Sequence, residues 1–255
     1  MSDRETTPAG IPCWIDLTSS DPDKARAFYA SLFGWAAETA GEEYGNYITF
    51  SKDGHPVAGM MRNDQTGQPD AWSVYLSSRD VAATAKAAAE AGGRILVEPM
   101  QVGDQGSMAI FLDSTGAAVG AWQPDQHKGF GREGEEGSPS WFELSTRDYA
   151  GAIEFYEKVF GWRTEEMSDT AELRYTLNAA LEESSAGIYD AAAAMPEGVP
   201  SNWQVYLGVA NADAAVAKVR ELGGTVLREP WDSPYGRMAQ VADPTGAAFM
   251  ISTVK

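Results

Sequence analysis

The chain has 255 residues, an apolar fraction of 44% and eight tryptophans, which is enough for two domains with hydrophobic cores. Its formal net charge of −18 is a poor match to nucleic acid or to an anionic membrane, because neutralising phosphates requires clustered Lys and Arg. The acidity can equally serve solubility alone. The single cysteine, Cys13, excludes an intramolecular disulfide and a cysteine-rich metal site.

The first ten residues are polar, and no run of the chain approaches 18 apolar residues. We therefore expect a cytoplasmic protein without a signal peptide or a membrane span. Cys13 precedes a strand and has no histidine near it in sequence, so we interpret it as a buried, inert thiol.

The first predicted elements are a strand and a helix. Residues 14–18 alternate as a strand does, which puts Trp14, Asp16 and Thr18 on one face. The helix over residues 25–33 is preceded by capping residues and a proline, and it is followed by a glycine that can adopt the left-handed cap conformation.

The remaining elements of the first half follow in order. We expect strands over 44–50 and 56–61, a connector over 62–70, a strand over 72–77, an Ala-rich helix over 81–91, a strand over 95–98, and a hairpin of 106–113 with 117–122. The turn of that hairpin reads Asp-x-Thr-Gly, which we interpret as turn chemistry without a catalytic role.

The second half repeats the first. Trp14 corresponds to Trp141 with an offset of 127, and Trp72 corresponds to Trp203 with an offset of 131. Residues 124–138 mix Pro, Gly and both signs of charge without periodicity, and they predict a linker between a domain over 11–123 and a domain over 139–253. Residues 191–200 are expected to form a flexible connector within the second domain.

Four strand–helix–three-strand modules, with Phe-Tyr and then Phe-Gly on the helices that follow Trp14 and Trp141, resemble the vicinal oxygen chelate superfamily of glyoxalases, bleomycin-resistance proteins and extradiol dioxygenases. The resemblance covers residues 11–253. It implies an α+β fold in which four βαβββ modules form two half-open barrels in tandem. Each barrel would be a cup with a ligand on its concave face, and in the enzymes of the family the cup usually also holds a divalent metal.

The resemblance also implies where the metal ligands would lie. In this sequence those positions are occupied by Trp14 and Gly120, with a third at or beside Trp72 and Ser73; in the second domain they are Trp141 and Met250, with a third at or beside Trp203 and Gln204. None of these side chains is an imidazole or a carboxylate, the ligands that such metals need. We therefore expect no metal and no other cofactor.

In the family's register, Trp14 and Trp141 stand at the position of the first metal ligand. The expected ligand-binding residues are Trp14, Thr18, Tyr47, Trp72, Tyr75, Trp122, Trp141, Ser145, Tyr175, Trp203 and Tyr206. The tryptophans among them would form an aromatic wall on which a planar molecule can stack. The alternative for each tryptophan is packing in the core on the helix-covered face.

Asp16 and Glu143 are the candidate catalytic residues. A carboxylate among indoles is desolvated, which raises its pKa and lets it abstract a proton next to a carbonyl. The alternative is a carboxylate that only accepts a hydrogen bond from a neighbouring hydroxyl or Arg.

Two functional hypotheses follow. The first is a metal-free protein that binds an aromatic or planar organic molecule, as the antibiotic-resistance branch of the family does. The second is a glyoxalase-like lyase or isomerase, or a hydroxylase-type enzyme of secondary metabolism, with Asp16 or Glu143 as base. Both take a small molecule as partner rather than nucleic acid or membrane, and both allow a monomer or a homodimer.

Overall fold

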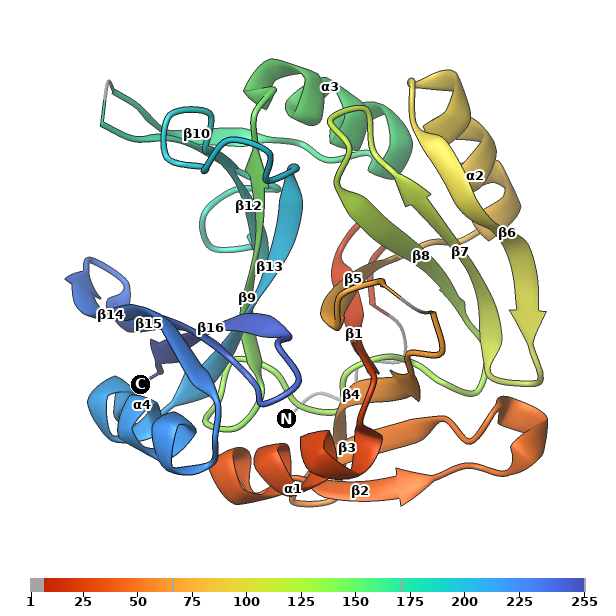
Figure 1. Cartoon of the computed structure of the whole chain (residues 1–255). Helices are drawn as coiled ribbons and strands as arrows, with labels where there is room; N and C mark the ends of the chain where they lie inside the picture. Colours follow the sequence, from red (N-terminus) through yellow and green to blue (C-terminus); the bar gives the residue numbers. More distant parts are fainter. Residues whose placement is uncertain (1–6, 66, 171, 255) are drawn as a thin grey trace. The chain divides into compact units, whose positions relative to one another are not determined.

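The computed structural model describes residues 7–65, 67–170 and 172–254 (Figure 1). Its four α-helices within these ranges are α1 (Pro22–Phe33), α2 (Val81–Glu90), α3 (Tyr149–Phe160) and α4 (Ala212–Glu221). None of the helices in the described part of the chain is long and apolar enough to cross a membrane.

Two eight-stranded sheets follow the two halves of the sequence. The first has the order β2-β3-β4-β1-β5-β8-β7-β6 and the second the order β10-β11-β12-β9-β13-β16-β15-β14. The strands of the first sheet are β1 (Pro12–Ser19), β2 (Ala36–Thr39), β3 (Ile48–Lys52), β4 (His55–Arg62), β5 (Ala71–Ser77), β6 (Arg94–Val102), β7 (Gly106–Leu112) and β8 (Ala118–Pro124). Those of the second are β9 (Pro139–Thr146), β10 (Glu165–Asp169), β11 (Arg174–Leu177), β12 (Ala186–Asp190), β13 (Asn202–Val209), β14 (Thr225–Ser233), β15 (Gly236–Ala242) and β16 (Ala248–Thr253).

This order repeats a strand, a helix and three strands four times, which confirms the predicted α+β fold of four βαβββ modules. The first strand of each module pairs in parallel with its last strand, as β1 does with β4 and β5 with β8. A helix connects the first strand to the rest of the module, as parallel pairing requires.

Local sequence explains where the helices begin and end. Asp21, Asp80, Asp148 and Asn211 each accept a hydrogen bond from a backbone N–H in the first helical turn. Helices α1 and α3 end at glycines in the left-handed region, with φ of 71° at Gly34 and 70° at Gly161.

One predicted strand begins later than expected. Residues 42–44 form the short helix η1 (Glu42–Tyr44), and Gly45 and Asn46 have positive φ of 64° and 55°. Positive φ ends an extended strand, so β3 begins only at Ile48. Strand β2 was not predicted, because its residues are mostly exposed and show no alternation of apolar and polar side chains.

The chain packs as two compact units, and neither is a continuous half of the sequence. Among the described residues, the first unit contains 7–13 together with Val74–Gly129 and Phe142–Trp203. The second contains Trp14–Ser73, Phe130–Trp141 and 204–254. Helix α2 therefore packs with α3 in the first unit, and α1 packs with α4 in the second.

A buried tyrosine lies at the centre of each unit. In the second unit the Tyr29 hydroxyl donates to Asp243 Oδ2 at 3.1 Å and accepts from Trp72 Nε1 at 3.2 Å. In the first unit the Tyr156 hydroxyl donates to Asp113 Oδ2 at 2.9 Å and accepts from Trp203 Nε1 at 2.8 Å. Burial, with the nearby carboxylate, raises the pKa of both tyrosines well above the ordinary value.

The two aspartates open the Asp-x-Thr-Gly turns. Asp113 Oδ1 accepts hydrogen bonds from Thr115 and from the Ala117 N–H, which is the expected turn chemistry. The other carboxylate oxygen receives the helix tyrosine from a module in the other half of the sequence. The turns thus also anchor the core of each unit.

Candidate functional site

Trp14, Asp16 and Tyr47 form one hydrogen-bonded cluster in the second unit. The Tyr47 hydroxyl donates to Asp16 Oδ1 at 2.5 Å. The Trp14 indole N–H lies 2.8 Å from the Tyr47 oxygen and 3.1 Å from the same Asp16 oxygen. Trp14 and Asp16 are both buried. The two donors converge on one buried carboxylate oxygen, which satisfies the hydrogen bonding of a buried polar atom.

The cluster lies on the face of β1, β3 and β4 that points away from α1. Phe50 on β3 contacts Tyr29 of α1, with ring centroids 5.9 Å apart, and strand alternation puts Tyr47 on the opposite side. Ile15 on β1 has no exposed surface and belongs to the core face. The predicted residue Thr18 shares the Asp16 face and pairs with Met61 at the end of β4.

Gly59 on β4 makes room for the cluster. It is the strand partner of Asp16. A Cβ atom at Gly59 would lie 1.6 Å from the Tyr47 hydroxyl and 2.2 Å from Asp16 Oδ1, closer than any real contact. The tyrosine hydroxyl therefore occupies the space that a side chain on β4 would fill.

Phe130 packs against the indole of this cluster. Its ring centroid lies 5.6 Å from that of Trp14, at an interplanar angle of 34°. The result is a carboxylate and a phenol hydroxyl beside an indole and a benzyl ring, which is a combination suited to a planar molecule that carries polar substituents.

The second half repeats the arrangement with a glutamate. Glu143 on β9 is the strand partner of Gly187 on β12. A Cβ atom at Gly187 would lie 2.2 Å from the Tyr175 hydroxyl. Ser145 pairs with Tyr189, whose ring centroid lies 6.5 Å from that of Tyr175. Glu143 and Tyr175 thus flank a glycine as Asp16 and Tyr47 do.

Tyr75 and Trp122 share one face of the first unit. Tyr75 is the strand partner of Gly120, and a Cβ atom at Gly120 would lie 2.2 Å from the Tyr75 ring. Trp122 donates from its indole to the backbone oxygen of His127 at 3.0 Å, and the two rings meet edge to face at 5.5 Å. Tyr206, the counterpart of Tyr75, pairs with Met250 and is buried.

Trp72 and Trp203 point toward the helices instead. Each donates to the buried tyrosine of its unit and packs edge to face against that ring. Trp72 and Trp203 therefore pack in the core on the helix-covered face, and we do not include them in the candidate site. Trp141 lies half-buried on β9.

Trp14 and Gly120, two of the residues at positions that the resemblance assigns to metal ligands, offer no side-chain atom that can bind a metal. Trp14 offers only an N–H donor, which is directed at Tyr47 and Asp16. Gly120 offers no side chain, and the Tyr75 ring fills the space of one. Among residues 7–65, 67–170 and 172–254 no three or more His, Cys, Asp or Glu side chains gather in a group that could hold a metal ion.

Sequence reasoning identified Trp14, Asp16 and Tyr47 but missed the glycines that accommodate them. Gly59, Gly120 and Gly187 each interrupt a strand of otherwise suitable residues. A glycine within a strand often marks a close approach by another group, so this signal was present in the sequence.

The sequence matches the Glyoxalase/Bleomycin resistance protein/Dioxygenase superfamily over residues 13–120 and again over 138–251. It is 36% identical to "Putative glyoxylase CFP32" of Mycobacterium tuberculosis, over 98% of this chain and 97% of that protein. It is 35% identical to "Anthracycline biosynthesis protein DauV" of Streptomyces sp., over 95% of this chain and 92% of that protein.

Solved structures share the fold at low sequence identity. The Mn(II)-bound glyoxalase from Novosphingobium aromaticivorans superposes with a TM-score of 0.65 at 17% identity, over 96% of this chain and 82% of that one. A catechol 2,3-dioxygenase gives a TM-score of 0.65 at 14% identity, over 97% and 88% of the two chains. Since the family match extends over most of both halves, this chain belongs to the glyoxalase/bleomycin resistance protein/dioxygenase superfamily.

Proposed function

We propose that the protein binds a planar, hydroxylated aromatic small molecule without a metal, on the sheet face around Trp14, Asp16 and Tyr47. The observation that carries this proposal is the Tyr47–Asp16 hydrogen bond beside the Trp14 indole. A phenolic ligand can donate to the Asp16 carboxylate and accept from the Tyr47 hydroxyl while its rings pack against Trp14 and Phe130.

Two kinds of support come from outside this cluster. Glu143 and Tyr175 flank Gly187 as Asp16 and Tyr47 flank Gly59, which supports a corresponding candidate surface in the second half. Relatives covering nearly the whole chain are named for anthracycline biosynthesis, which agrees with a polycyclic aromatic ligand.

The alternative is an enzyme with Asp16 or Glu143 as general base, of the glyoxalase-like lyase or isomerase type or of the hydroxylase type. The observation that favours it is the hydrogen bond from the Tyr47 hydroxyl to Asp16, because it places a candidate acid beside a candidate base. Here Tyr47 would protonate an oxygen of the substrate while the carboxylate removes a proton next to it. The name of the CFP32 relative is consistent with such an activity.

Binding is tested by calorimetric titration of EDTA-treated protein with quinizarin, a planar dihydroxyanthraquinone, and with anthraquinone, which lacks the hydroxyls. Saturable binding of quinizarin is expected. Tyr47→Phe and Asp16→Asn should each weaken it about tenfold, the effect of losing one hydrogen bond to a charged group. Tyr235→Phe makes the same chemical change in an exposed hairpin turn and should leave the affinity unchanged.

The same titration separates the proposals. Equal affinity for quinizarin and anthraquinone, or no saturable binding of either, would contradict the proposed role of Asp16 and Tyr47. Conversion of a bound compound, detected by mass spectrometry in the presence of EDTA and lost in Asp16→Asn or Glu143→Gln, would establish the enzyme instead.

A further inference from the structure

The two halves of the chain differ at the residue that follows the first strand. This residue is Ser20 after β1 and Arg147 after β9, at the offset of 127 that relates the two strands. In both halves its backbone N–H donates to a side chain at the start of the next module. The acceptor is Asp70 for Ser20, at 2.8 Å, and Ser201 for Arg147, at 3.2 Å.

In the first unit, Arg147 binds the loop that leads to Ser201. Its Nε donates to the Val199 oxygen at 3.0 Å and one terminal nitrogen donates to the Met195 oxygen at 3.1 Å. The same nitrogen also donates to the Pro196 oxygen. Three backbone carbonyls thus hold one guanidinium group.

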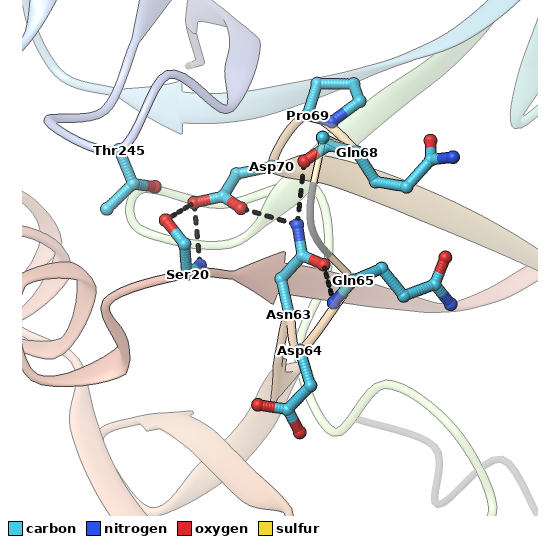
Figure 2. A pocket seen from close by; sticks show the side chains of 9 residues that line it. Ser20, Asn63, Asp64, Gln65, Gln68, Pro69, Asp70 and Thr245 are labelled. Atoms are coloured by element: carbon cyan, nitrogen blue, oxygen red, sulfur yellow. Dashed lines mark hydrogen bonds between the residues drawn. The ribbon is translucent and has the colours of Figure 1, made fainter.

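In the second unit, the corresponding corner is a pocket. The two corresponding loops begin in the same way, because the Asn63 N–H donates to the Ser19 oxygen and the Ala191 N–H donates to the Thr146 oxygen. The loop from Asn63 to Asp70 is three residues shorter than the loop from Ala191 to Ser201. With Ser20 in place of an arginine, a cavity of about 350 Å³ remains, lined among others by Asp64, Gln65 and Asp70 (Figure 2).

The pocket is lined by carboxylates, whereas the corresponding corner of the other half is filled by the Arg147 cation. Figure 2 shows the buried Asp70 carboxylate held by Ser20 and Asn63, with Thr245 beside it. Burial opposes ionisation of Asp70, but hydrogen bonds from Ser20, Asn63 and Thr245 outweigh it and lower the pKa of this carboxyl. Asp70 is therefore a fixed negative charge at neutral pH, and the exposed Asp64 adds a second carboxylate to the lining.

We propose that this pocket binds the guanidinium group of a small molecule, in the way that the other half of the chain binds its own Arg147. A guanidinium presents planar N–H donors, which suit carboxylates such as those of Asp64 and Asp70. The cavity volume is at the lower end of small-molecule sites and fits a compact ligand. The net charge of −18 favours the approach of a cation.

The site is independent of the proposed aromatic site. None of the residues that line the pocket belongs to the Trp14–Asp16–Tyr47 cluster. Ser20 follows β1 and Asn63 follows β4, so the pocket is built beyond the ends of the strands that carry the cluster. Either proposal can therefore fail without the other.

The test is calorimetric titration of the full-length protein with ethylguanidinium chloride. Its neutral counterpart ethylurea, which has nearly the same shape, serves as the control probe. Saturable binding of ethylguanidinium alone is expected. Ser20→Arg should abolish it, because the new arginine fills the pocket as Arg147 fills the other corner. Asp70→Asn should weaken it at least tenfold.

A second measurement does not depend on the Ser20 and Asp70 variants. Arg147→Ser should lower Tm and open a similar pocket in the first unit, and millimolar ethylguanidinium, but not ethylurea, should raise the Tm of this variant more than that of the wild type. No saturable binding of ethylguanidinium by the wild type, or binding that Ser20→Arg leaves unchanged, would overturn the proposal.

Two further probes define the ligand. The first probe is a Gly-Arg-Gly peptide amide. If it binds more weakly than ethylguanidinium, the result supports a free small molecule as the ligand. If it binds more tightly, the ligand is instead an arginine side chain of another protein, and that part of the proposal is overturned. Magnesium chloride that competes with ethylguanidinium at lower concentration would identify a metal site instead.

Discussion

Tyr156 shows how one hydroxyl can hold three distant segments together. It accepts from Trp203 and donates to Asp113, and all three side chains are buried. Phenylalanine at this position would leave a buried carboxylate oxygen and a buried indole N–H without their partner. Each such group costs about 1–3 kcal/mol.

We therefore predict that Tyr156→Phe lowers the free energy of unfolding by about 2–4 kcal/mol in urea titrations. A double-mutant cycle with Asp113→Asn should give a coupling energy of at least about 1 kcal/mol. If the two changes were additive, the hydrogen bond would not carry the effect.

His127 provides a pH-dependent contribution to stability. Burial lowers its pKa from 6.5 to about 4. The unfolded chain therefore takes up the proton before the folded protein does, so this contribution is complete above pH 6.5 and is lost as the pH falls toward 4. The loss reaches about 3 kcal/mol at pH 4, since one pKa unit corresponds to about 1.4 kcal/mol.

The prediction is that His127→Gln loses less stability than the wild type between pH 7 and pH 4. Urea unfolding at both pH values measures the two losses, and their difference isolates His127 from the carboxylates that titrate in both proteins. Equal losses would show that His127 does not titrate with a lowered pKa.

At the scale of elements, strand partners decide which side chains can meet. The parallel register of β1 and β4 places Gly59 opposite Asp16, and this is what admits the Tyr47 hydroxyl. Gly59→Ala should displace Tyr47 from Asp16 and weaken quinizarin binding at least tenfold.

The double variant Gly59→Ala with Tyr47→Phe gives a direct check, because removing the hydroxyl removes the closest clash. It should be more stable than Gly59→Ala alone, as measured by Tm. A lower Tm for the double variant would mean that the alanine clashes with the strand itself and not with Tyr47.

The sequence pattern predicts most elements and the positions of the cluster residues on them. Alternation puts Trp14 and Asp16 on one strand face, and the repeat relates them to Trp141 and Glu143. Alternation does not indicate which face of a sheet the helices cover. Trp72 and Trp203 lie on the helix-covered face because their indoles donate to the tyrosines of α1 and α3. The exposed strand β2 is invisible to such reasoning, because neither of its faces is apolar.

At the scale of the molecule, each compact unit draws on both halves of the sequence. Phe28 and Tyr29 of α1 contact Phe249 of β16, and Tyr29 also binds Asp243. The repeat predicts the modules and their order, but it carries no information on which modules share a core. That pairing depends on long-range contacts that a local pattern does not encode.

This interleaving predicts that the halves of the chain do not fold alone. A fragment of residues 1–131 lacks the partners of α1, and a fragment of 132–255 lacks those of α3. Each fragment should show no cooperative thermal transition, and mixing them should restore one. Cooperative unfolding of either fragment by itself would contradict the packing described for the two units.

We propose above that the Trp14–Asp16–Tyr47 cluster binds a planar aromatic ligand without a metal. Titration of the full-length protein with quinizarin, before and after treatment with EDTA and with metal content measured on the same sample, tests both parts of this proposal. We expect saturable binding of unchanged affinity in both samples, with no stoichiometric metal in either. Stoichiometric Zn, Ni, Fe or Mn in the untreated protein, with binding lost on its removal, would contradict it.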